Sequence, residues 1–279
     1  MEKGNLGSPL LIYNRNTQRA FDLRSKLGED KTEVVESISD GVAKANVIIT
    51  CLSNDAVVQE FMDVMLQGKV DGKSFVESST LHPKTTEALA EKVIAAGAEF
   101  VAAPVFGTPA VAENGQLIAV LGGPKASVDK ARPYYSGVMA RAEIDLSDKP
   151  YGQASTMKLV GNTVFSMVEQ LAEAHTFAEK LGLGTDAVHQ FVELFYGGTW
   201  AKYSNRILTG DRYKAEQPLV GVDLVMKDAN HVFKMAKDVG VKLGLAEVAY
   251  KHLEDFKEHQ GSEGGELGEY MVRLERSRV

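Results

Sequence analysis

The feature of this sequence that most restricts its fold is a regular alternation between residues 9 and 148. Short apolar runs with the length of strands alternate there with amphipathic stretches that have the length of helices. Strands and helices that alternate in this way form a parallel sheet covered by helices. The expected strands are Leu10–Tyr13, Val47–Leu52, Ser74–Glu77, Glu99–Ala102 and Leu117–Leu121, and the expected helices cover residues 17–27, 55–67, 83–97 and 126–138.

The pattern changes after the segment from Asp148 to Gly152. Residues 153–182 have one continuous helical pattern, which predicts a single helix of roughly 45 Å at 1.5 Å per residue. Few strand signals follow, and the sequence therefore predicts two domains: an α/β domain over residues 1–148 and an all-α domain over residues 149–279. The further expected helices cover residues 185–195, 199–209, 219–239 and 245–258.

The first expected strand has the character of the second strand of a Rossmann domain. It ends in Asn14-Arg15, polar groups of the kind that meet the adenosine ribose of a dinucleotide. The central strand, the glycine-rich turn and the first helix would precede it, and Met1 to Gly4 are too few for them. The segment Gly4-Asn5-Leu6-Gly7 precedes a strand instead of following one, so we do not expect it to bind pyrophosphate. The predicted fold class is α/β, an N-terminally truncated Rossmann domain followed by an all-α domain, with impaired cofactor binding.

Composition and charge exclude several classes of protein. The 279 residues include 31 Lys and Arg against 38 Asp and Glu, and the net charge of −7 disfavours a nucleic-acid partner. No apolar run approaches the ~18 residues of a membrane span, and the N-terminus has no signal-peptide core. We therefore expect no membrane partner and a cytoplasmic location, or a mitochondrial one if a transit segment was lost.

The cysteine and histidine residues give two further expectations. The single cysteine, Cys51, is expected to be buried in its strand. The six histidines lack metal-ligand spacing, so no metal site is expected.

Small polar residues follow two of the expected strands, at the edge where an open parallel sheet collects its ligands. Leu52 and Ser53 follow the second strand, and Thr80 follows the third. These three residues are candidates for contacts with the ribose and nicotinamide of a cofactor. Asp55 and Thr80 are also candidates for the N-caps of the helices that follow, and both interpretations can hold together.

Asn14 and Arg15 are the corresponding candidates after the first expected strand. The guanidinium of Arg15 suits the 2′-phosphate of NADP, because it can bind phosphate through two hydrogen bonds. The other interpretation is a solvated loop arginine. If Arg15 binds phosphate, NADP is favoured over NAD, with NAD still possible.

Two further segments are candidates for a substrate site. The loop from Ala103 to Pro109 follows a strand and could present backbone N–H groups to a carboxylate, or it could be purely structural. Lys158 and Asn162 are four residues apart, so they share one face of the expected long helix. A lysine with a lowered pKa can give a proton to a carbonyl under reduction, and an asparagine can hold the same oxygen. Because a lone lysine on a helix is usually solvated, the spacing alone leaves both interpretations of Lys158 open.

Taken together, these segments resemble the β-hydroxyacid dehydrogenases. This family contains 3-hydroxyisobutyrate dehydrogenase, glyoxylate and succinic semialdehyde reductases, and relatives of 6-phosphogluconate dehydrogenase. The resemblance covers nearly all 279 residues, and the combination of a Lys/Asn segment with a distant Lys-Asp segment is specific. The segments that carry it are Tyr13-Asn14-Arg15, Ala103 to Gly107, Gly152-x(5)-Lys158-x(3)-Asn162 and Leu224-Val225-Met226-Lys227-Asp228.

The resemblance implies hydride transfer between NAD(P) and a small hydroxyacid or carbonyl compound. It implies an active site between the two domains, with Lys158 as proton donor in reduction and acceptor in oxidation, and Asn162 beside it. It also implies a homodimer or homotetramer. The other implied contacts are Phe106, Gly107 and Thr108 for the substrate, and Lys227 for substrate and cofactor.

The sequence departs from the family pattern in the substrate loop. Phe106 stands where the family usually has a serine that contacts the substrate carboxylate, and Thr108 stands where a glycine is usual. We therefore expect a more apolar pocket than in an enzyme for small hydroxyacids. The alternative function is a non-catalytic, cofactor-deficient relative that acts as an oligomeric scaffold or binding module. An imine reductase is a third hypothesis, which Lys158 disfavours because those relatives generally lack this lysine.

Overall fold

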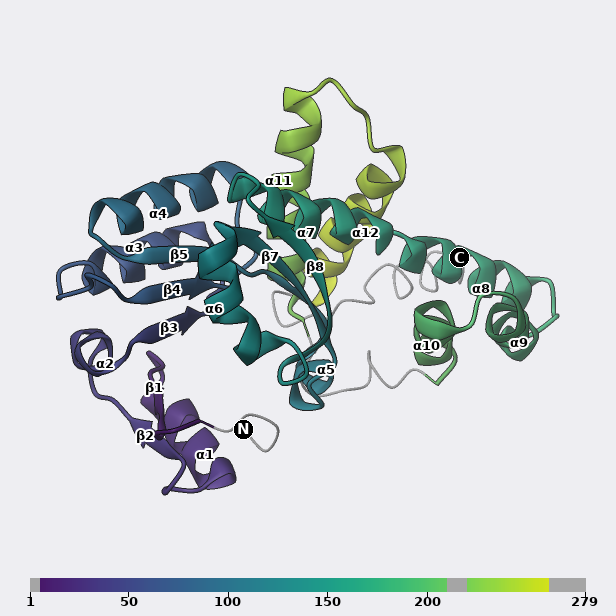
Figure 1. Cartoon of the computed structure of the whole chain (residues 1–279). Coiled ribbons are helices and arrows are strands. Elements are labelled where there is room, and N and C mark those ends of the chain that lie inside the picture. The colour runs from purple at the N-terminus through teal and green to yellow at the C-terminus, as the bar shows by residue number, and fades with distance from the viewer. Residues whose placement is uncertain (1–5, 210–219, 261–279) are drawn as a thin grey trace. The chain divides into compact units, whose positions relative to one another are not determined.

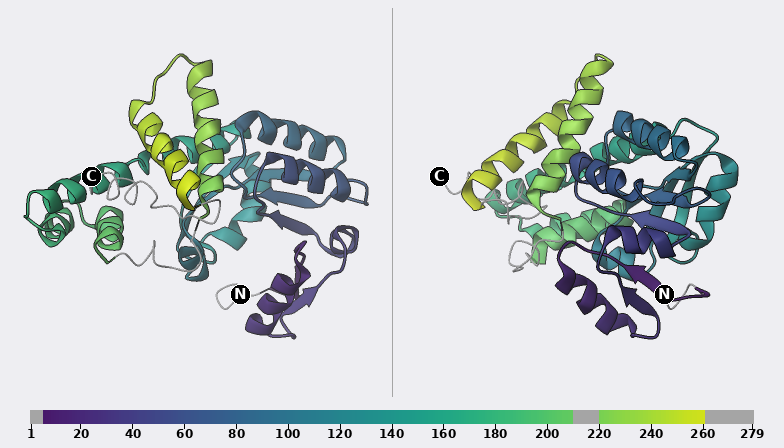
Figure 2. Two further views of the ribbon diagram at one scale, coloured as in Figure 1. Left: turned by 180° about the vertical axis from the view of Figure 1, so that it is seen from behind. Right: turned by 90° about the vertical axis from the view of Figure 1, so that its left-hand side faces the viewer.

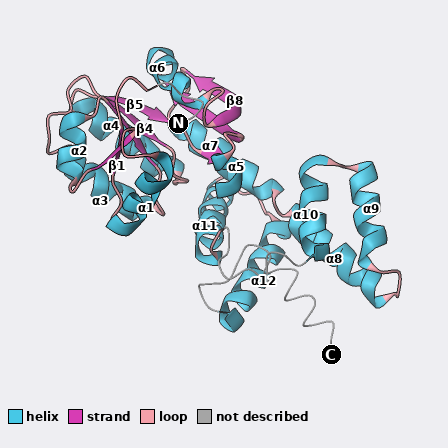
Figure 3. Cartoon of the chain, turned by 90° about the horizontal axis from the view of Figure 1, so that it is seen from below, coloured by secondary structure: helices cyan, strands magenta, loops and turns pink. Residues whose placement is uncertain are grey.

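The computed structural model describes residues 6–209 and 220–260 of the chain (Figure 1). The chain divides into two compact units, Met1–Lys158 and Leu159–Val279. All strands of the described residues belong to the first unit, and the second is helical (Figure 3). This confirms the predicted fold class. Of the segment Gly4 to Gly7, from which we expected no pyrophosphate binding, Gly4 and Asn5 lie outside the described residues.

The first unit contains a two-stranded sheet, β1–β2, and a six-stranded sheet in the order β3-β4-β5-β7-β6, with β8 also paired with β7. Neighbours from β3 to β5 are parallel, β7 is antiparallel to β5 and β6, and β8 is parallel to β7. The sequence predicted the apolar strands and missed β2, β6 and β8. The bounds are β1 (Leu10–Ile12), β2 (Thr32–Val34), β3 (Val47–Thr50), β4 (Ser74–Glu77), β5 (Glu99–Ala102), β6 (Val105–Phe106), β7 (Leu117–Gly123) and β8 (Ala140–Ser147).

Helices cover both faces of the six-stranded sheet (Figure 1, Figure 2). Phe75 and Phe100 pack into a core with α3 and α4, and the next residues along the strands, Val76 and Val101, pack into a core with α6. Consecutive strand residues face opposite sides, so a strand buried on both faces is apolar throughout. The helices of this unit are α1 (Thr17–Leu27), α2 (Ile38–Lys44), α3 (Asp55–Met65), α4 (Pro83–Ala95), α5 (Pro109–Glu113), α6 (Lys125–Tyr135) and the first part of α7 (Gly152–Val164).

The strand β3 is an edge strand, which corrects one expectation. Within the described chain it pairs with β4 alone, and β1–β2 form a separate parallel pair. Ile49 is 42% exposed, and Cys51, one residue beyond the end of β3, is also exposed. The prediction that Cys51 is buried is therefore wrong, because this strand is covered by a neighbour on one side only.

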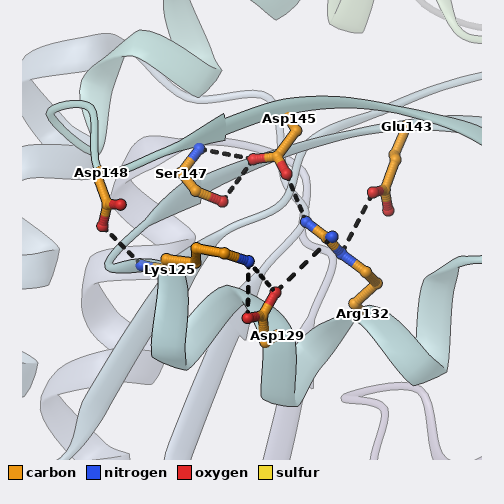
Figure 4. Close-up of polar contacts among 7 residues, drawn as sticks. All are labelled: Lys125, Asp129, Arg132, Glu143, Asp145, Ser147 and Asp148. Atoms are coloured by element: carbon orange, nitrogen blue, oxygen red, sulfur yellow. Dashed lines mark hydrogen bonds and ion pairs between the residues drawn. The ribbon is translucent and has the colours of Figure 1, made fainter.

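The unpredicted strand β8 is joined to α6 by polar contacts (Figure 4). Arg132 of α6 contacts Glu143 (Nε to Oε1, 3.2 Å) and Asp145 (Nη2 to Oδ2, 2.6 Å). Asp148, just after β8, accepts the backbone N–H of Lys125 at 2.8 Å, at the start of the same helix. These contacts hold β8 in place, and the chain then leads directly into α7. The predicted domain boundary near residue 148 lies in this connection between β8 and α7.

Two helices, α7 and α8 (Met167–Lys180), replace the single helix predicted over residues 153–182. At the break, the N–H groups of Phe165 and Ser166 bond to carbonyl groups three residues back, each at 3.1 Å. The Thr163 hydroxyl donates to the Val160 carbonyl at 2.7 Å, a local bond that competes with regular helix hydrogen bonding. The prediction of one continuous helix is wrong. The spacing of apolar residues does not reveal these local hydrogen bonds, which interrupt the helix.

The remaining helices of the second unit match their predicted positions closely. One small core joins α8, α9 and α10 through Leu171, Val192 and Ile207. Another joins α11 and α12 through Val222, Leu253 and Phe256. None of the helices described is long and apolar enough to cross a membrane. The bounds are α9 (Thr185–Phe195), α10 (Gly198–Thr209), α11 (Val222–Asp238) and α12 (Gly244–Gln260).

Buried polar contacts also tie the helices of the second unit together. His175 of α8 is fully buried and lies 2.9 Å from the Ser204 hydroxyl of α10. Burial and the neighbouring His189 lower the pKa of His175 to about 4, so this imidazole is neutral near pH 7. His252 of α12 contacts the buried Glu169 of α8 at 2.9 Å. These pairs specify how the helices pack, because a buried polar group that loses its partner is costly.

Candidate active site

Glu77, at the carboxyl end of β4, is a buried anchor for two strand ends. Its side chain is 2% exposed, its Oε2 accepts the Thr50 hydroxyl at 2.5 Å, and its Oε1 accepts the Ser79 N–H at 2.6 Å. Burial raises the pKa of the Glu77 carboxyl, and the bonds from Ser79 and Thr50 oppose that rise because they favour the ionised form. The carboxyl group thus holds β3 and β4 together at the sheet edge where ligands collect in open parallel sheets.

The predicted cofactor residues Leu52, Ser53 and Thr80 lie on the loops that Glu77 anchors. The Ser79 hydroxyl accepts the Leu52 N–H at 2.7 Å, which joins the loop after β3 to the loop after β4. Ser53 is exposed, and Thr80 is half-buried. The structure therefore brings these three residues, which are distant in sequence, into two adjoining loops.

The caps of the following helices are not those that the sequence predicted. Asn54 caps α3 by accepting the Val57 N–H at 3.0 Å, and His82 caps α4 by accepting the Lys84 N–H at 3.2 Å. The prediction of Asp55 and Thr80 as caps is therefore wrong. Asp55 accepts the His82 N–H at 3.0 Å instead, a second bond between the two loops.

Asn14 and Arg15 lie at the carboxyl end of β1, on the two-stranded sheet. Both side chains are exposed, and the Asn14 Oδ1 accepts the Asn16 N–H at 2.9 Å in the turn that leads into α1. Tyr13, one residue earlier, lies against Phe61 of α3 with ring centroids 6.0 Å apart. This ring contact links the end of β1 to the helix that follows β3.

The start of α7 is held against α4. The Gly152 N–H donates to Glu87 Oε1 at 2.7 Å, and the hydroxyl groups of Thr86 and Ser155 lie 2.7 Å apart. A Cβ on Gly152 would lie 3.0 Å from the Pro83 carbonyl oxygen, closer than most Cβ atoms approach another atom. Glycine thus allows this close approach, and α4 sets the position from which α7 carries Lys158.

Lys158 lies over an aromatic ring. Its Nζ is 4.4 Å from the centroid of the Phe106 ring, and both residues are half-buried. Gly107 follows Phe106 with φ 143°, and a Cβ there would lie 2.6 Å from Leu117 Cδ2, so the backbone packs tightly at this point. Thr108 is half-buried and precedes α5. The structure brings Phe106 and Lys158 together, which sequence spacing could not show.

A second group of predicted residues meets within the second unit. Asn162 Nδ2 donates to Asp228 Oδ2 at 2.8 Å, and Lys227 Nζ lies 3.0 Å from Asp228 Oδ1. Asp228 thus holds an asparagine of α7 and a lysine of α11 together. The sequence analysis named Asn162 and Lys227 as site residues and missed the role of Asp228, although Asp228 was visible in the Lys-Asp segment. No cluster of His, Cys, Asp or Glu that could hold a metal ion occurs among residues 6–209 and 220–260.

The chain matches known proteins over nearly its whole length. Residues 4–144 match the family model of the NAD binding domain of 6-phosphogluconate dehydrogenase, and residues 152–270 match that of NAD-binding of NADP-dependent 3-hydroxyisobutyrate dehydrogenase. The NADH-dependent oxidoreductase ucdB of Aspergillus ustus is 34% identical to this chain over 275 residues, which cover 98% of the chain and 92% of that protein.

Two solved structures have a similar fold. The 3-hydroxyisobutyrate dehydrogenase of Salmonella typhimurium superposes with a TM-score of 0.79 and 21% identity, covering 94% of this chain and 90% of that one. Psf3 in complex with NADP+ and 2-OPP superposes with a TM-score of 0.82 and 19% identity, covering 95% and 91%. At these identities the likeness concerns the fold alone.

We predict that removing the Glu77 carboxyl group destabilises the first unit. Glu77→Ala leaves the half-buried Thr50 hydroxyl and the buried Ser79 N–H without their acceptor, and we expect a loss of about 2–4 kcal/mol in the free energy of unfolding. Glu77→Gln retains an acceptor for Ser79 and should lose about 1 kcal/mol. Urea unfolding measures both, with the exposed Glu60→Ala as control. Equal losses in the two Glu77 variants would contradict the assigned role of its hydrogen bonds.

Proposed function

This chain belongs to the β-hydroxyacid dehydrogenase family, and on that premise we propose that it transfers hydride between NADP and a small hydroxyacid or carbonyl compound, with Lys158 as the acid/base residue. Both family matches are to nicotinamide-cofactor domains, so the chain belongs to a family of oxidoreductases that bind NAD(P). The observation that carries the proposal is the placement of Lys158, half-buried at the anchored start of α7 and 4.4 Å from the Phe106 ring.

We assign the proton transfer to Lys158 Nζ. In reduction, Nζ gives its proton to the carbonyl oxygen while the carbonyl carbon receives the hydride, so ketone, NADPH and H+ yield alcohol and NADP+. In oxidation, Nζ takes the proton from the hydroxyl group. Asn162 lies one helical turn further along α7. Its amide has two N–H groups, of which Asp228 accepts one, and we assign the other to the same substrate oxygen.

The described residues suit a dinucleotide, which supplies the hydride when bound. Exposed Ser53 and half-buried Thr80 follow adjacent parallel strands, where ribose and nicotinamide bind in open sheets. Lys227, half-buried beside Asp228, is a candidate contact for substrate and cofactor. We propose NADP over NAD because the exposed Arg15 follows β1 and a guanidinium suits the 2′-phosphate. The relative from Aspergillus ustus is NADH-dependent by name, which makes the role of Arg15 the decisive point.

The alternative remains a cofactor-deficient relative that acts as an oligomeric scaffold. The separation of β1–β2 from the six-stranded sheet favours it, because dinucleotides bind along a continuous sheet edge. Titration of NADPH fluorescence with the purified chain separates the two functions. Saturable binding supports the reductase, and absence of binding supports the scaffold. The same titration tests the impaired cofactor binding expected from the sequence.

We also propose that the chain forms a homodimer through apolar side chains of its second unit, with a homotetramer as a larger form of the same assembly. Leu194 and Phe195 of α9 are 80% and 70% exposed, and Phe177 of α8 is 64% exposed. Exposed apolar residues that gather on neighbouring helices are typical of interfaces between subunits. A cytoplasmic location also stays a prediction.

We predict that Lys158→Ala lowers kcat by roughly 10²–10⁴-fold, the usual contribution of general acid–base catalysis. Lys158→Arg should not restore turnover, because arginine does not give up its proton near neutral pH. NADPH affinity should stay nearly unchanged in both variants. Steady-state kinetics and NADPH titration measure these effects, with the exposed Gln153→Ala of α7 as control. Near-normal turnover in Lys158→Ala would overturn the mechanism and make Lys227 the next candidate.

We predict that Arg15→Ala selectively weakens NADPH binding. The loss of hydrogen bonds to a charged group should cost about 1.5–3 kcal/mol, or about 10–150-fold in Kd, and leave NADH binding unchanged. Fluorescence titration with both cofactors gives the ratio, with the exposed Arg19→Ala of α1 as control. A ratio equal to that of the wild type would remove Arg15 from the cofactor site.

We predict that a charge placed on α9 breaks the dimer. Leu194→Glu should shift the mass measured by light scattering from that of two chains toward that of one, because a carboxylate would be buried without a partner. The neighbouring exposed Gln190→Glu adds the same charge and serves as control. A monomeric wild-type protein would contradict the proposal.

A further inference from the structure

We propose that Phe106 determines the class of substrate, and that Lys158 serves carbonyl compounds whose reacting carbon carries an aromatic or other uncharged apolar group. Substrates with a carboxylate beside the reacting carbonyl are disfavoured. This inference rests on the proposed function, because it takes Lys158 as the proton donor. It goes beyond that function by naming what lies beside the reacting carbonyl.

The position of Phe106 is set by the backbone on both sides. It lies on β6, whose two residues pair in antiparallel register with Ile118 and Ala119 of β7. Gly107 follows with φ 143°, and its backbone approaches the side chains of Leu117 and Val111 so closely that a Cβ would lie 2.6 and 2.8 Å from them. The ring therefore belongs to the sheet and does not sit on a loop that can swing away.

The Phe106 ring packs on an apolar core. Phe106, Tyr151 and Met157 are partly buried, and all three pack against the same buried core of the first unit. Tyr151 directly precedes α7, and Met157 is the residue of α7 before Lys158. The ammonium of Lys158 thus meets an aromatic face at 4.4 Å in a setting supplied by β6 and α7.

This pairing selects between two kinds of substituent on the substrate. A carbonyl oxygen accepts a hydrogen bond from Nζ, and an aryl group next to it can pack against the Phe106 ring in edge-to-face or offset geometry. A carboxylate in the same place would lose hydration against a ring that has no hydrogen-bond donor. It would also compete with the carbonyl oxygen for Nζ, which favours unproductive binding. An aromatic ketone or α-ketoester therefore suits this arrangement better than an α-ketoacid.

The test uses two ketones that share an aryl group and a reacting carbonyl, the anion phenylglyoxylate and its uncharged methyl ester, each reduced with NADPH. We expect the wild type to give a kcat/KM at least about tenfold higher for the ester. A tenfold difference corresponds to about 1.4 kcal/mol in the free energy of the transition state. Phe106→Ser should lower the ester-to-acid ratio by about tenfold or more. Glu113→Ala, an exposed change at the end of α5, should leave the ratio unchanged.

A second variant distinguishes the effect of the aromatic ring from that of an apolar side chain in general. Phe106→Leu keeps an apolar side chain, so it should retain the preference for ester over acid. It should also lower the ratio of methyl phenylglyoxylate to methyl pyruvate, since leucine offers no aromatic face.

The outcomes distinguish this inference from the proposed function. A wild type that prefers the acid, or a Phe106→Ser variant with an unchanged ester-to-acid ratio, overturns the inference alone. Turnover of glyoxylate or succinic semialdehyde with no turnover of either phenyl ketone also overturns it. If the NADPH-bound wild type reduces none of these carbonyl compounds, the proposed function fails and the inference falls with it.

Discussion

The close approach of α7 to α4 and β7 is the contact on which the candidate active site depends. Gly152 lies where a Cβ would meet the Pro83 carbonyl oxygen, and a Cβ on Gly122 of β7 would lie 3.0 Å from that of Ala154. Small residues on both sides let the helix begin directly against the sheet and its neighbouring helix. The bond from Gly152 to Glu87 then sets where the helix starts. Because Lys158 follows less than two turns later, its place in the first unit is decided by this packing.

In a sheet that is buried on both faces, polar functional groups are confined to the ends of the strands. The central strands β4 and β5 are apolar on both sides, and helices cover those sides. Glu77 is the exception, a carboxyl group that is buried at the point where its strand ends. Such a group is tolerated because two donors, the Thr50 hydroxyl and the Ser79 N–H, compensate its loss of hydration. The same bonds shape the loops that carry Leu52, Ser53 and Thr80.

The two lysines that the sequence singles out have different surroundings. Lys158 faces an aromatic ring, which stabilises a cation through its quadrupole without accepting a proton. Lys227 faces the carboxylate of Asp228, which also engages Asn162. Lys158 lies beside the predicted substrate loop of the first unit, whereas Lys227 belongs to a group with Asn162 and Asp228 in the second unit. This placement is the reason why we assign the acid/base role to Lys158.

The sequence by itself determined the architecture and most of the candidate residues. Apolar runs buried on both sides and helices with one apolar face leave a periodic signal, so the main strands of the sheet and the helices from residue 185 onward were predictable. The strand β8 was missed because charged residues interrupt its apolar pattern, although it pairs with β7 and its carboxylates contact Arg132. The break between α7 and α8 was missed because a local hydroxyl bond at Thr163 leaves no periodic trace.

Only the tertiary structure decided which of those residues meet. The contact between Phe106 and Lys158 joins positions 52 residues apart, and the bond between Asn162 and Asp228 joins positions 66 residues apart. Glu77 gained its role only when β3 and β4 paired and brought Thr50 to its carboxyl group. A sequence records which side chains are available and how often they recur along the chain. Contacts between distant positions depend on how strands pair and helices pack, and these arise from many weak interactions acting at once.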